Sequence, residues 1–420
     1  MQTFGELIDH GDALGQVLQS TPVLEAVEPP LSEAQGLVLE GDLYARFDSP
    51  MHENSAMDGF ALRSADAEVG RVFPVVDEAP AGSPATKGVG EGEAVKVFTG
   101  GVIPEGADAV VPVENTSGYG AEFELKSPVR SGANVRGSGE DVREGELMLS
   151  DGAEIGPSEI ALAASQGYGS LPVRRRPRVV VFSTGTELVE PGSRELSPGE
   201  VYDSNSYALL AQAREAGAGV SRMASATDDP GAIRSAMSQA LESADIVVTS
   251  GGVSMGERDL VKEMLLELGV EQRFWGIKLK PGKPVFYGTR EDVRFFGLPG
   301  NPVSAMVCFE LFVRPAISRM MGRREREDPG RPRTEVYFDE AVENKFGRTH
   351  AMRVSLTRTD RGWRAESVGA QGSGLISSLT KADALAMIGP ECEGVAAGEP
   401  VEAIVLRPGV LTSPETPAGG

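Results

Sequence analysis

The chain has 420 residues, of which 40% are hydrophobic, and its formal net charge is -22 at pH 7. This length and apolar content predict two to four domains, each with its own core. The negative charge argues against nucleic acid and anionic membranes as partners, because both are bound through basic patches. Its two cysteines, Cys308 and Cys392, are far apart and suggest neither a disulfide framework nor a CxxC metal site.

The N-terminal segment MQTFGELIDHGDAL is acidic and amphipathic, and it has neither the basic region nor the apolar stretch of an export signal. No apolar run elsewhere approaches membrane-spanning length. With so few cysteines, these features favour a protein of the reducing cytoplasm. We expect residues 1–47 to combine with residues 141–174 as an elongated module that is discontinuous in sequence.

The segment that interrupts this module, residues 48–140, is rich in glycine and proline. It carries short alternating apolar runs such as VFPVVDEA and EAVKVFTG, which predict a small β-rich inserted domain. Residues 155–167 then resemble a short helix with a proline in its first turn.

Residues 175–324 alternate β-branched runs with helical patterns and predict a central, mostly parallel α/β domain. The expected strands cover residues 179–184, 244–250 and 293–300, and the expected helices cover residues 206–216, 230–242, 258–268 and 302–319. Ligands of such sheets bind beyond the carboxyl ends of the strands, where the glycine-rich motifs of this segment fall.

The segment RREREDPGRPR is a charged linker that contains proline and glycine. After it, residues 330–408 consist of short apolar runs separated by turns, which predicts a C-terminal β-barrel-like domain. Residues 409–420 are expected to be a disordered tail.

The motif TSGGVSMGERD joins an apolar strand to an amphipathic helix. Its glycines let a ligand approach the backbone and its serines add donors, so Ser250, Gly251, Gly252 and Ser254 predict an oxyanion cradle. Glu257 and Asp259 could bridge a bound phosphate through Mg²⁺, which combines carboxylates with phosphate oxygens and water. The alternative is that both acids only complement the helix dipole.

Three further motifs fall at strand ends or helix starts. STGTEL offers hydroxyls and a carboxylate, YDSN predicts a helix cap, and ATDDP offers Asp228 either as a cap or as a ligand. The residues that these motifs contribute are Ser183, Thr184, Gly185, Glu187, Asp203, Asn205 and Asp228.

The motif GIKLKPGKP concentrates Lys278, Lys280 and Lys283 around a Pro-Gly turn of an otherwise acidic protein, which indicates an anion site. In GLPGNPVSA, Pro299 and Pro302 flank a turn that opens a helix, although these prolines could merely end the strand. Together the motifs describe a pocket with phosphate donors, lysines and metal-binding carboxylates.

The motifs occur in the order seen in the molybdopterin molybdenumtransferase (MoeA) family, which includes the E domain of gephyrin. The resemblance extends to about residue 406, and the combination is specific although each motif alone is weak. It is carried by SAMDGFAL, FTGGVIPEGADAVVPVE, NVRGSGEDV, STGTEL, GEVYDSN, TSGGVSMGERD, KLKPGKP and GLPGNPVSA.

The resemblance implies that the central domain binds molybdopterin. It also implies a reaction in which adenylylated molybdopterin and molybdate give molybdenum cofactor and AMP with Mg²⁺ or another divalent cation. A homodimer is expected, served by a separate molybdopterin adenylyltransferase and supplying apo-molybdoenzymes.

Carried over by motif, the catalytic residues are Asp58, Thr99, Asp141, Glu187, Asp228, Asp259 and Lys283, and the metal ligands are Glu187, Asp228, Glu257 and Asp259. The substrate-binding residues are the strand-end and cradle residues named above together with Lys278, Lys280, Pro299, Pro302, Arg353 and Ser373.

Arg353 and Ser373 are expected, by the same resemblance, to complete the pocket of the neighbouring subunit. Two alternatives stay open: a tungsten-inserting or client-specific paralogue, and a non-catalytic molybdopterin-binding scaffold of the gephyrin type. The clustered carboxylates and lysines argue against a purely structural role, because such clusters are costly to keep together.

Overall fold

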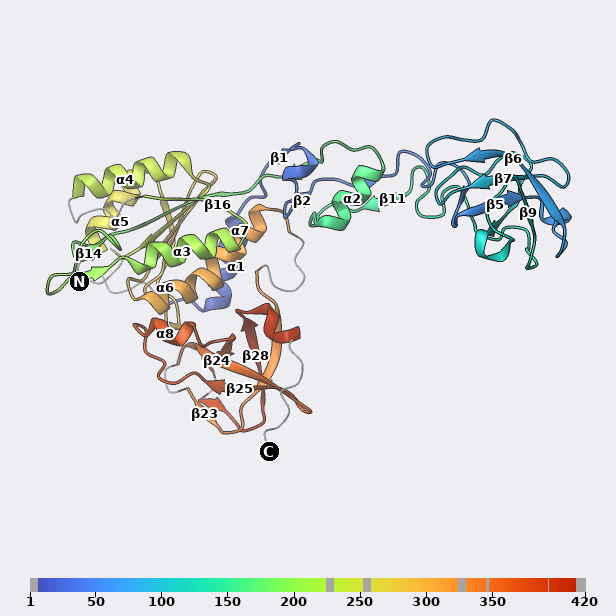
Figure 1. Ribbon diagram of the computed structural model, residues 1–420. Coiled ribbons are helices and arrows are strands. Elements are labelled where there is room, and N and C mark those ends of the chain that lie inside the picture. The colour runs from blue at the N-terminus through green and yellow to red at the C-terminus, as the bar shows by residue number, and fades with distance from the viewer. Residues whose placement is uncertain are drawn as a thin grey trace. The chain divides into compact units, whose positions relative to one another are not determined.

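The computed structural model describes residues 7–223, 230–251, 258–323, 330–344, 347–391 and 393–412, without the side chains of residues 258–262 (Figure 1). It divides into two compact units, which are taken in turn. The first comprises Met1–Val27, Gly36–Val38 and Pro172–Gly420, and the second comprises Glu28–Gln35 and Leu39–Leu171.

A six-stranded sheet forms the centre of the first unit, in the order β16-β13-β17-β21-β20-β18. The first four strands are parallel and the last two are antiparallel, so the predicted parallel sheet has an antiparallel edge. The strands are β13 (Arg178–Ser183), β16 (Gly219–Arg222), β17 (Ile246–Ser250), β18 (Glu271–Trp275), β20 (Phe286–Arg290) and β21 (Val293–Leu298).

Helices cover both faces of this sheet, which explains why its central strands are almost continuously apolar. One face carries α4 (Pro230–Ser243) and α5 (Arg258–Glu267), and the other carries α3 (Ser204–Glu215). The helix expected over residues 302–319 is observed with a π-helical turn inside it: α6 (Pro302–Cys308), η4 (Phe309–Val313) and α7 (Arg314–Met320).

The N-terminal helix α1 (His10–Ser20) belongs to this unit, which corrects the expected grouping of residues 1–47 with residues 141–174. It packs against η4 and α7, and the Leu24 N–H donates to the Met320 carbonyl at 2.8 Å. Ala13 and Val17 of this helix are fully buried. Sequence pattern shows that α1 has an apolar face, but it does not show which distant helix covers that face.

The C-terminal part of the first unit is a closed five-stranded barrel, as its short strands predicted. Closure comes from the pairing of β26 with β24. The barrel strands are β22 (Arg333–Tyr337), β24 (Thr349–Thr359), β25 (Gly362–Ser367), β26 (Ala384–Ile388) and β28 (Pro400–Val405). The predicted tail overlaps a short 3-10 helix, η5 (Pro408–Thr412), and its residues 413–420 lie outside the described residues.

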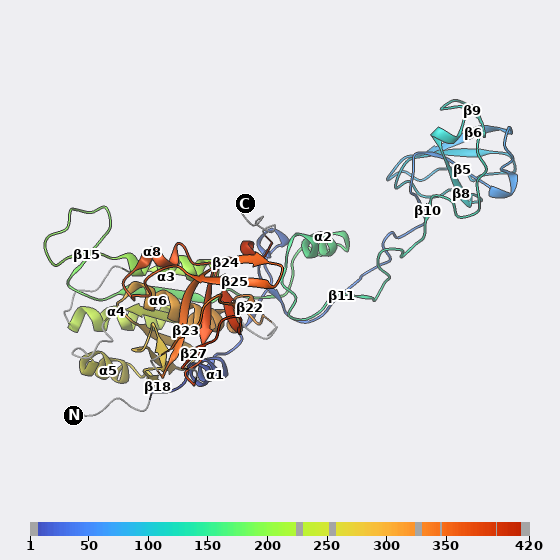
Figure 2. The ribbon, with the colours of Figure 1, turned by 90° about the horizontal axis from the view of Figure 1, so that it is seen from below.

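A short strand of the lysine motif, β19 (Leu279–Lys280), leaves the α/β domain and pairs in parallel with β24 of the barrel. Figure 2 shows the barrel strands and the helices of the α/β domain from below. The lysine motif is therefore fixed by main-chain hydrogen bonds to the barrel.

The second unit contains a five-stranded sheet in the order β8-β5-β7-β6-β9, which matches the expected β-rich segment. Its core includes Phe60, Phe73 and Phe123, whose rings stack on one another. The strands are β5 (Gly59–Leu62), β6 (Val72–Ala79), β7 (Ala94–Val97), β8 (Ala109–Pro112) and β9 (Glu122–Glu124).

The same unit contains the short helix predicted near residue 160, observed as α2 (Pro157–Ser165). It also contains the pair β3 (Leu43–Tyr44) and β11 (Leu147–Leu149). Within the parts of the chain that the structure describes, no helix is both long enough and apolar enough to cross a membrane.

Candidate functional site

The carboxyl end of β13 is fastened to the first turn of α3. Asp203 caps α3 by accepting from the Ser206 N–H at 3.1 Å and the Ser206 hydroxyl at 2.6 Å. The Ser183 hydroxyl donates to the same carboxylate at 2.9 Å. Asp203 is only 1% exposed, so the structure supports a positioning role for a residue that the sequence predicted to bind substrate.

A second residue of this turn, Asn205, joins two further strand ends. Its amide nitrogen donates to the Ser250 hydroxyl at 2.8 Å and to the Gly300 carbonyl at 2.7 Å. The Ser250 hydroxyl donates in turn to the Pro299 carbonyl at 3.1 Å. The ends of β13, β17 and β21 are thus held in one place by two side chains of α3 and its cap.

Thr184 and Gly251 meet between these strand ends. The Thr184 N–H donates to the Ser250 carbonyl at 3.0 Å. Gly251 has φ +89°, and a Cβ there would lie 2.5 Å from the Thr184 carbonyl oxygen, so only glycine fits. The Thr184 hydroxyl is buried and has no hydrogen-bond partner among the described residues, which leaves a polar group for a ligand or a water.

Glu187 is exposed just beyond this point. A Cβ on Gly185 would lie 2.5 Å from Glu187 Oε2, so the carboxylate folds back over the glycine backbone at the strand end. Such a carboxylate suits a hard divalent cation.

The other predicted metal ligands cannot be placed with it. Asp228, Gly252, Ser254 and Glu257 lie outside the described residues, and so does the side chain of Asp259. In the described part of the chain, no three side chains of the His, Cys, Asp or Glu type are grouped as a metal site. The predicted magnesium site therefore stays a prediction.

The lysine motif lines a pocket of about 520 Å³ between the α/β domain and the barrel. One wall carries Lys280, Lys283 and Ser304, and the other carries Arg348, Gln371 and Ser373. Lys278 is placed elsewhere, because its Nζ lies 3.3 Å from Asp9 Oδ2. The structure thus brings two of the three predicted lysines together with the predicted Ser373.

Arg353 lies beneath this pocket and is fully buried in β24. Its Nη2 donates to the carbonyls of Ala370 and Gly372, at 3.4 Å and 3.2 Å, which holds the loop that carries Ser373. Nε and Nη1 have no hydrogen-bond partner among the described residues, and burial lowers the pKa of this guanidinium. A buried cation that no carboxylate neutralises attracts an anion.

The pKa values of Lys280 and His350 are lowered by burial and by the positive charges around them. Burial, followed by the charges of Arg348 and Arg353, lowers the pKa of Lys280. Burial, followed by the charges of Lys280 and Arg353, lowers the pKa of His350 to about 4, so this imidazole is neutral at pH 7. The pocket is therefore electropositive and favours an oxyanion.

Gly282 fixes the lysine turn against α6. Its φ is +118°, and a Cβ at this position would collide with the sulfur of Cys308. Cys308 is fully buried, as its place on an apolar helix face predicted. The Ser373 carbonyl accepts from the Val303 N–H at 3.1 Å, so both walls of the pocket touch the same helix.

The structure places Arg353 and Ser373 beside the lysines of their own chain. Their expected contribution to a neighbouring subunit stays a prediction. The sequence missed Arg348 and Gln371, which come from an irregular stretch about 65 to 90 residues beyond the lysine motif, and no local pattern marks them.

Asp58 and Thr99 meet in the second unit. Asp58 Oδ1 accepts from the Thr99 N–H at 2.7 Å and from the Thr99 hydroxyl at 2.9 Å. These bonds, led by the backbone one, lower the pKa of the exposed Asp58 carboxyl. Asp141 is an exposed residue of the same unit, anchored through its N–H to the Ser49 carbonyl at 2.9 Å.

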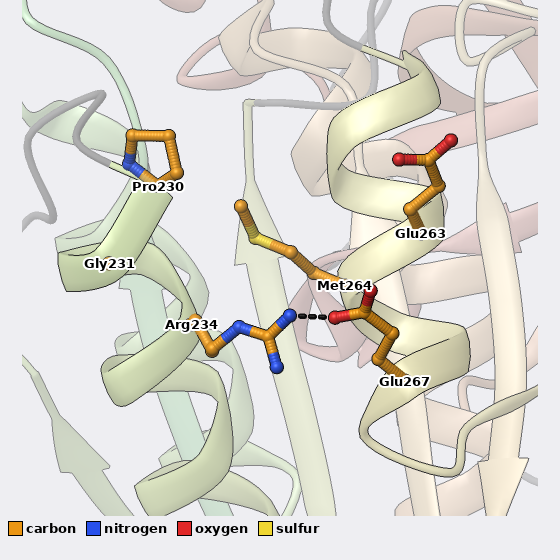
Figure 3. A pocket seen from close by; sticks show the side chains of 6 residues that line it. All are labelled: Pro230, Gly231, Arg234, Glu263, Met264 and Glu267. Atoms are coloured by element: carbon orange, nitrogen blue, oxygen red, sulfur yellow. Dashed lines mark ion pairs between the residues drawn. The ribbon is translucent and has the colours of Figure 1, made fainter.

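A separate cavity of about 200 Å³ lies between α4 and α5 (Figure 3). Arg234 and Glu267 form an ion pair across it. Its lining residues are Pro230, Gly231, Arg234, Glu263, Met264 and Glu267, and they share no residue with the predicted site.

Three family models match the chain in sequence order. They are the MoeA N-terminal region (domain I and II) over residues 8–167, a probable molybdopterin binding domain over residues 180–319, and the MoeA C-terminal region (domain IV) over residues 335–406. Both the strand-end residues and the lysine motif fall within the second match.

Curated relatives and solved structures agree with these matches. The chain is 36% identical to molybdopterin molybdenumtransferase 2 of Mycobacterium tuberculosis, over 88% of this chain and 92% of the relative. It is 35% identical to the molybdopterin molybdenumtransferase of Haemophilus influenzae, over 88% and 91%. A crystal structure of the molybdopterin biosynthesis MoeA protein of Pyrococcus horikoshii superposes with a TM-score of 0.77 at 29% identity, covering 95% of this chain and 100% of that one. The chain belongs to the MoeA family of molybdopterin molybdenumtransferases.

Proposed function

We propose that this protein inserts molybdate into adenylylated molybdopterin and releases AMP. The observation that carries the proposal is the pocket that brings Lys280, Lys283 and Arg348 together above the buried Arg353. Molybdate is a tetrahedral dianion, so it takes cationic N–H donors and hydroxyls in preference to carboxylates. Ser373 supplies a hydroxyl in the same pocket.

The strand ends suit the diphosphate of the second substrate. The Thr184 hydroxyl, which has no hydrogen-bond partner among the described residues, and the Ser250 hydroxyl lie where the sheet meets the N-terminus of α3. Groups of this kind bind phosphate oxygens in other α/β proteins. We assign the diphosphate to the strand ends and the molybdate to the lysine pocket.

The proposed reaction has two balanced parts. Water cleaves the phosphoanhydride bond, which gives AMP and molybdopterin monophosphate. The two dithiolene thiols then displace one oxo group of molybdate, and this oxygen leaves as water with both thiol protons. Lys280 and Lys283 hold the oxyanion and offset its charge, and Arg353 fixes the loop that carries Ser373.

Mg²⁺ or another divalent cation is part of the proposal. Among the described carboxylates Glu187 fits this role, because it is exposed at a strand end beside Gly185. Asp228, Glu257 and Asp259 would complete the ligand set, as the family resemblance implies. When bound, the cation neutralises the negative charge of the diphosphate.

We also propose that the chain acts as a homodimer in the cytoplasm. In that assembly Asp58, Thr99 and Asp141 would act in catalysis. A separate molybdopterin adenylyltransferase would supply the substrate, and apo-molybdoenzymes would receive the product. Light scattering of the purified protein tests the dimer: a monomeric mass contradicts it.

The test of the reaction measures AMP release from adenylylated molybdopterin with Mg²⁺, with and without molybdate. We expect molybdate-dependent release and activation of an apo-molybdoenzyme. The same assay with tungstate in place of molybdate distinguishes a molybdenum-inserting enzyme from a tungsten-inserting paralogue, in which tungstate would stimulate AMP release more than molybdate. Tight pterin binding without AMP release under any oxyanion would contradict the transferase and favour a scaffold.

A further inference from the structure

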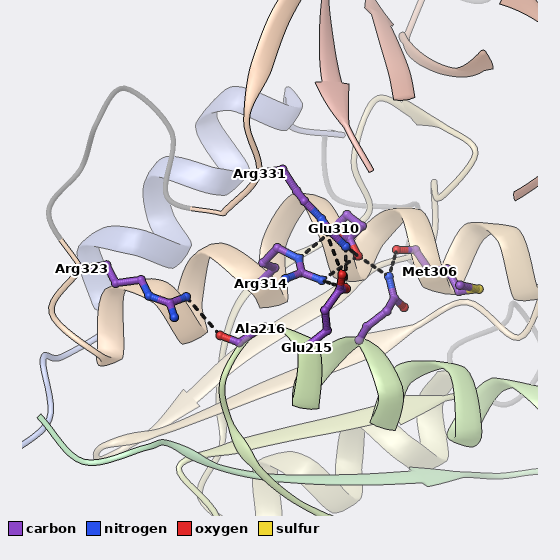
Figure 4. Close-up of polar contacts among 8 residues, drawn as sticks. Glu215, Ala216, Met306, Glu310, Arg314, Arg323 and Arg331 are labelled. Carbon is purple, nitrogen blue, oxygen red and sulfur yellow. Dashed lines mark hydrogen bonds and ion pairs between the residues drawn. The ribbon is translucent and has the colours of Figure 1, made fainter. Parts of the chain in front are cut away.

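A cluster of four charged side chains lies between the helices of the α/β domain and the barrel (Figure 4). Glu310 Oε2 accepts from Arg314 Nε at 2.6 Å and from Arg331 Nε at 2.9 Å. Glu215 Oε2 accepts from Arg314 Nη2 at 2.7 Å and from Arg331 Nη2 at 2.6 Å. We call these residues, Glu215, Glu310, Arg314 and Arg331, the ionic cluster.

The cluster is neutral overall, since two carboxylates face two guanidinium groups, and it runs from a buried centre to Glu215, which is exposed. Glu310 and Arg314 are 6% and 5% exposed. Burial alone would raise the pKa of Glu310, but the charge of Arg314 and the hydrogen bond from Arg331 outweigh it and the pKa is lowered. Gln212 adds a further donor to Glu310 at 2.6 Å, so this carboxylate is ionised and held from three directions.

The members of the cluster come from both sides of the domain boundary. Glu215, Glu310 and Arg314 belong to α3, η4 and α7 of the α/β domain. Arg331 lies two residues before β22, the first strand of the barrel. The cluster therefore ties the start of the barrel to the helical layer.

Apolar packing beside the cluster is incomplete. A cavity of about 280 Å³ on one side has Met306, Leu379 and Leu406 among its lining residues, and a much smaller one of about 20 Å³ on the other includes Leu14 and Ile404. Glu310 and Arg331 line both cavities. Because empty space flanks the cluster, directional ion pairs carry much of the positional constraint at this part of the boundary.

The lysine pocket depends on the same boundary, because its two walls come from the two domains. Contacts near the pocket also join the walls: β19 pairs with β24 at Lys280 and His350, and the Val303 N–H donates to the Ser373 carbonyl. Helix α6 begins at Pro302 beside the pocket and leads directly into η4, which contains Glu310. The ionic cluster is thus a further tie between the domains, at the middle of the same helical segment.

We propose that the ionic cluster is a positioning element of the lysine pocket, which sets the spacing between Lys280 and Lys283 on one wall and Arg348 and Ser373 on the other. The inference rests on the proposed function, because it takes this pocket as the oxyanion site. Without the cluster the barrel is held to the α/β domain mainly by the contacts beside the pocket, and it can shift relative to that domain. The cations would then no longer converge on one tetrahedral ion.

A role in stability alone makes a different prediction. Buried ion pairs lose much of their Coulomb gain to desolvation, and replacement by apolar side chains of similar volume is often neutral or stabilising. Methionine at positions 310, 314 and 331 would therefore preserve packing while removing directional bonding. Positioning and stability can be separated in this way.

The test compares the wild type with the triple variant Glu310→Met, Arg314→Met, Arg331→Met. Sodium molybdate binding is measured by calorimetry, and folding is measured by thermal melting. We expect a melting temperature close to that of the wild type and a molybdate Kd raised about tenfold. Arg364→Met is the matched control, because it removes an arginine that pairs with Asp339 at 3.3 Å on the barrel surface, and it should leave the Kd unchanged.

The single variant Arg331→Lys keeps the charge but loses the planar fork, and it covers the case in which the triple variant fails to fold. Hydrogen exchange of residues 279–284 and 371–373 is measured in parallel. We expect faster exchange there and a Kd raised about threefold. An unchanged Kd and unchanged exchange in a folded variant would overturn the positioning role.

The two proposals fail in different ways. If the wild type binds no molybdate, the assignment of the oxyanion to this pocket fails, and so does the positioning role stated for it. If the wild type binds molybdate and the folded triple variant binds it equally well, only the positioning role fails.

Discussion

The strand-end region and the lysine pocket differ in how their polar groups are satisfied. At the strand ends Ser183, Asp203, Asn205 and Ser250 bond mainly to one another, so the protein itself fixes their geometry. In the lysine pocket the buried Arg353 keeps two donor nitrogens without a hydrogen-bond partner in the described part of the chain. Apart from the Thr184 hydroxyl, the polar groups of the first region are satisfied by the protein, whereas the second keeps donors of Arg353 that suit an anion. Substitutions in the first should damage folding, and substitutions in the second should damage binding.

Lys283→Ala should give the largest effect, because it removes a cation from the pocket wall that neutralises the oxyanion. AMP release should fall about 10²- to 10³-fold, which corresponds to about 3–4 kcal/mol of transition-state stabilisation. The melting temperature should stay within about 2 °C of the wild type, because a cation whose role lies in the pocket adds little to folding.

Lys381→Ala is its control, since Lys381 is an exposed lysine of the same unit. Full activity of Lys283→Ala would show that this lysine has no role in the reaction. The proposed difference between the two regions would then be wrong.

Asp203→Ala should show the opposite pattern. It removes the cap of α3 and leaves the hydroxyls of Ser183 and Ser206 without their buried acceptor. We expect a loss of about 2–3 kcal/mol in the free energy of unfolding, measured by urea titration followed by circular dichroism. Asp292→Ala, at an exposed turn of the same domain, should change it by less than about 0.5 kcal/mol. Equal effects of the two variants would contradict the role of Asp203 as a fastening residue.

The burial of His350 beside Lys280 and Arg353 gives the stability of the protein a pH dependence. The folded pKa of His350, about 4, lies below the ordinary value of 6.5, so the unfolded state binds the proton more readily. The contribution to stability is complete above pH 6.5 and is lost as pH falls towards 4. The expected loss over this window is about 3 kcal/mol. His350→Gln should flatten the pH dependence of urea unfolding in this range, and an unaltered slope would contradict a neutral His350 buried beside these cations.

Thr184→Val should give the smallest effect on folding. It separates a strand-end residue that binds a ligand from one, such as Asp203, that stabilises the fold. The hydroxyl has no hydrogen-bond partner among the described residues, so its removal should change stability by less than about 0.5 kcal/mol. If this hydroxyl binds the diphosphate, KM for adenylylated molybdopterin should rise about three- to tenfold, and Thr184→Ser should restore it. A KM that does not change would exclude Thr184 from the substrate site.

The two regions also differ in how well the sequence predicts them, because the strand-end residues lie in compact motifs and the pocket residues are far apart in the chain. STGTEL, YDSN and TSGGVS are compact motifs, and the residues that meet at the strand ends lie directly within them or beside them. Periodicity likewise predicted the parallel sheet and the short strands of the barrel.

The lysine pocket needed the tertiary structure. Lys278 and Lys280 have the same charge and are only two residues apart, yet one pairs with Asp9 and the other lines the pocket. Arg348 lines the pocket together with Lys280 and Lys283 only because β19 leaves its own domain to pair with β24. For the same reason the sequence pattern did not predict the packing of α1 against α7 or the ion pair of Glu310 with Arg331. Such contacts depend on how domains pack, which local periodicity does not encode.

The most direct test of the account is a crystal of this protein soaked in molybdate, with anomalous diffraction recorded at the molybdenum edge. We predict a molybdenum peak between the two walls of the lysine pocket, in contact with Lys280, Lys283 and Arg348. A peak at the strand ends beside Thr184 and Glu187, with the lysine pocket empty, would contradict it.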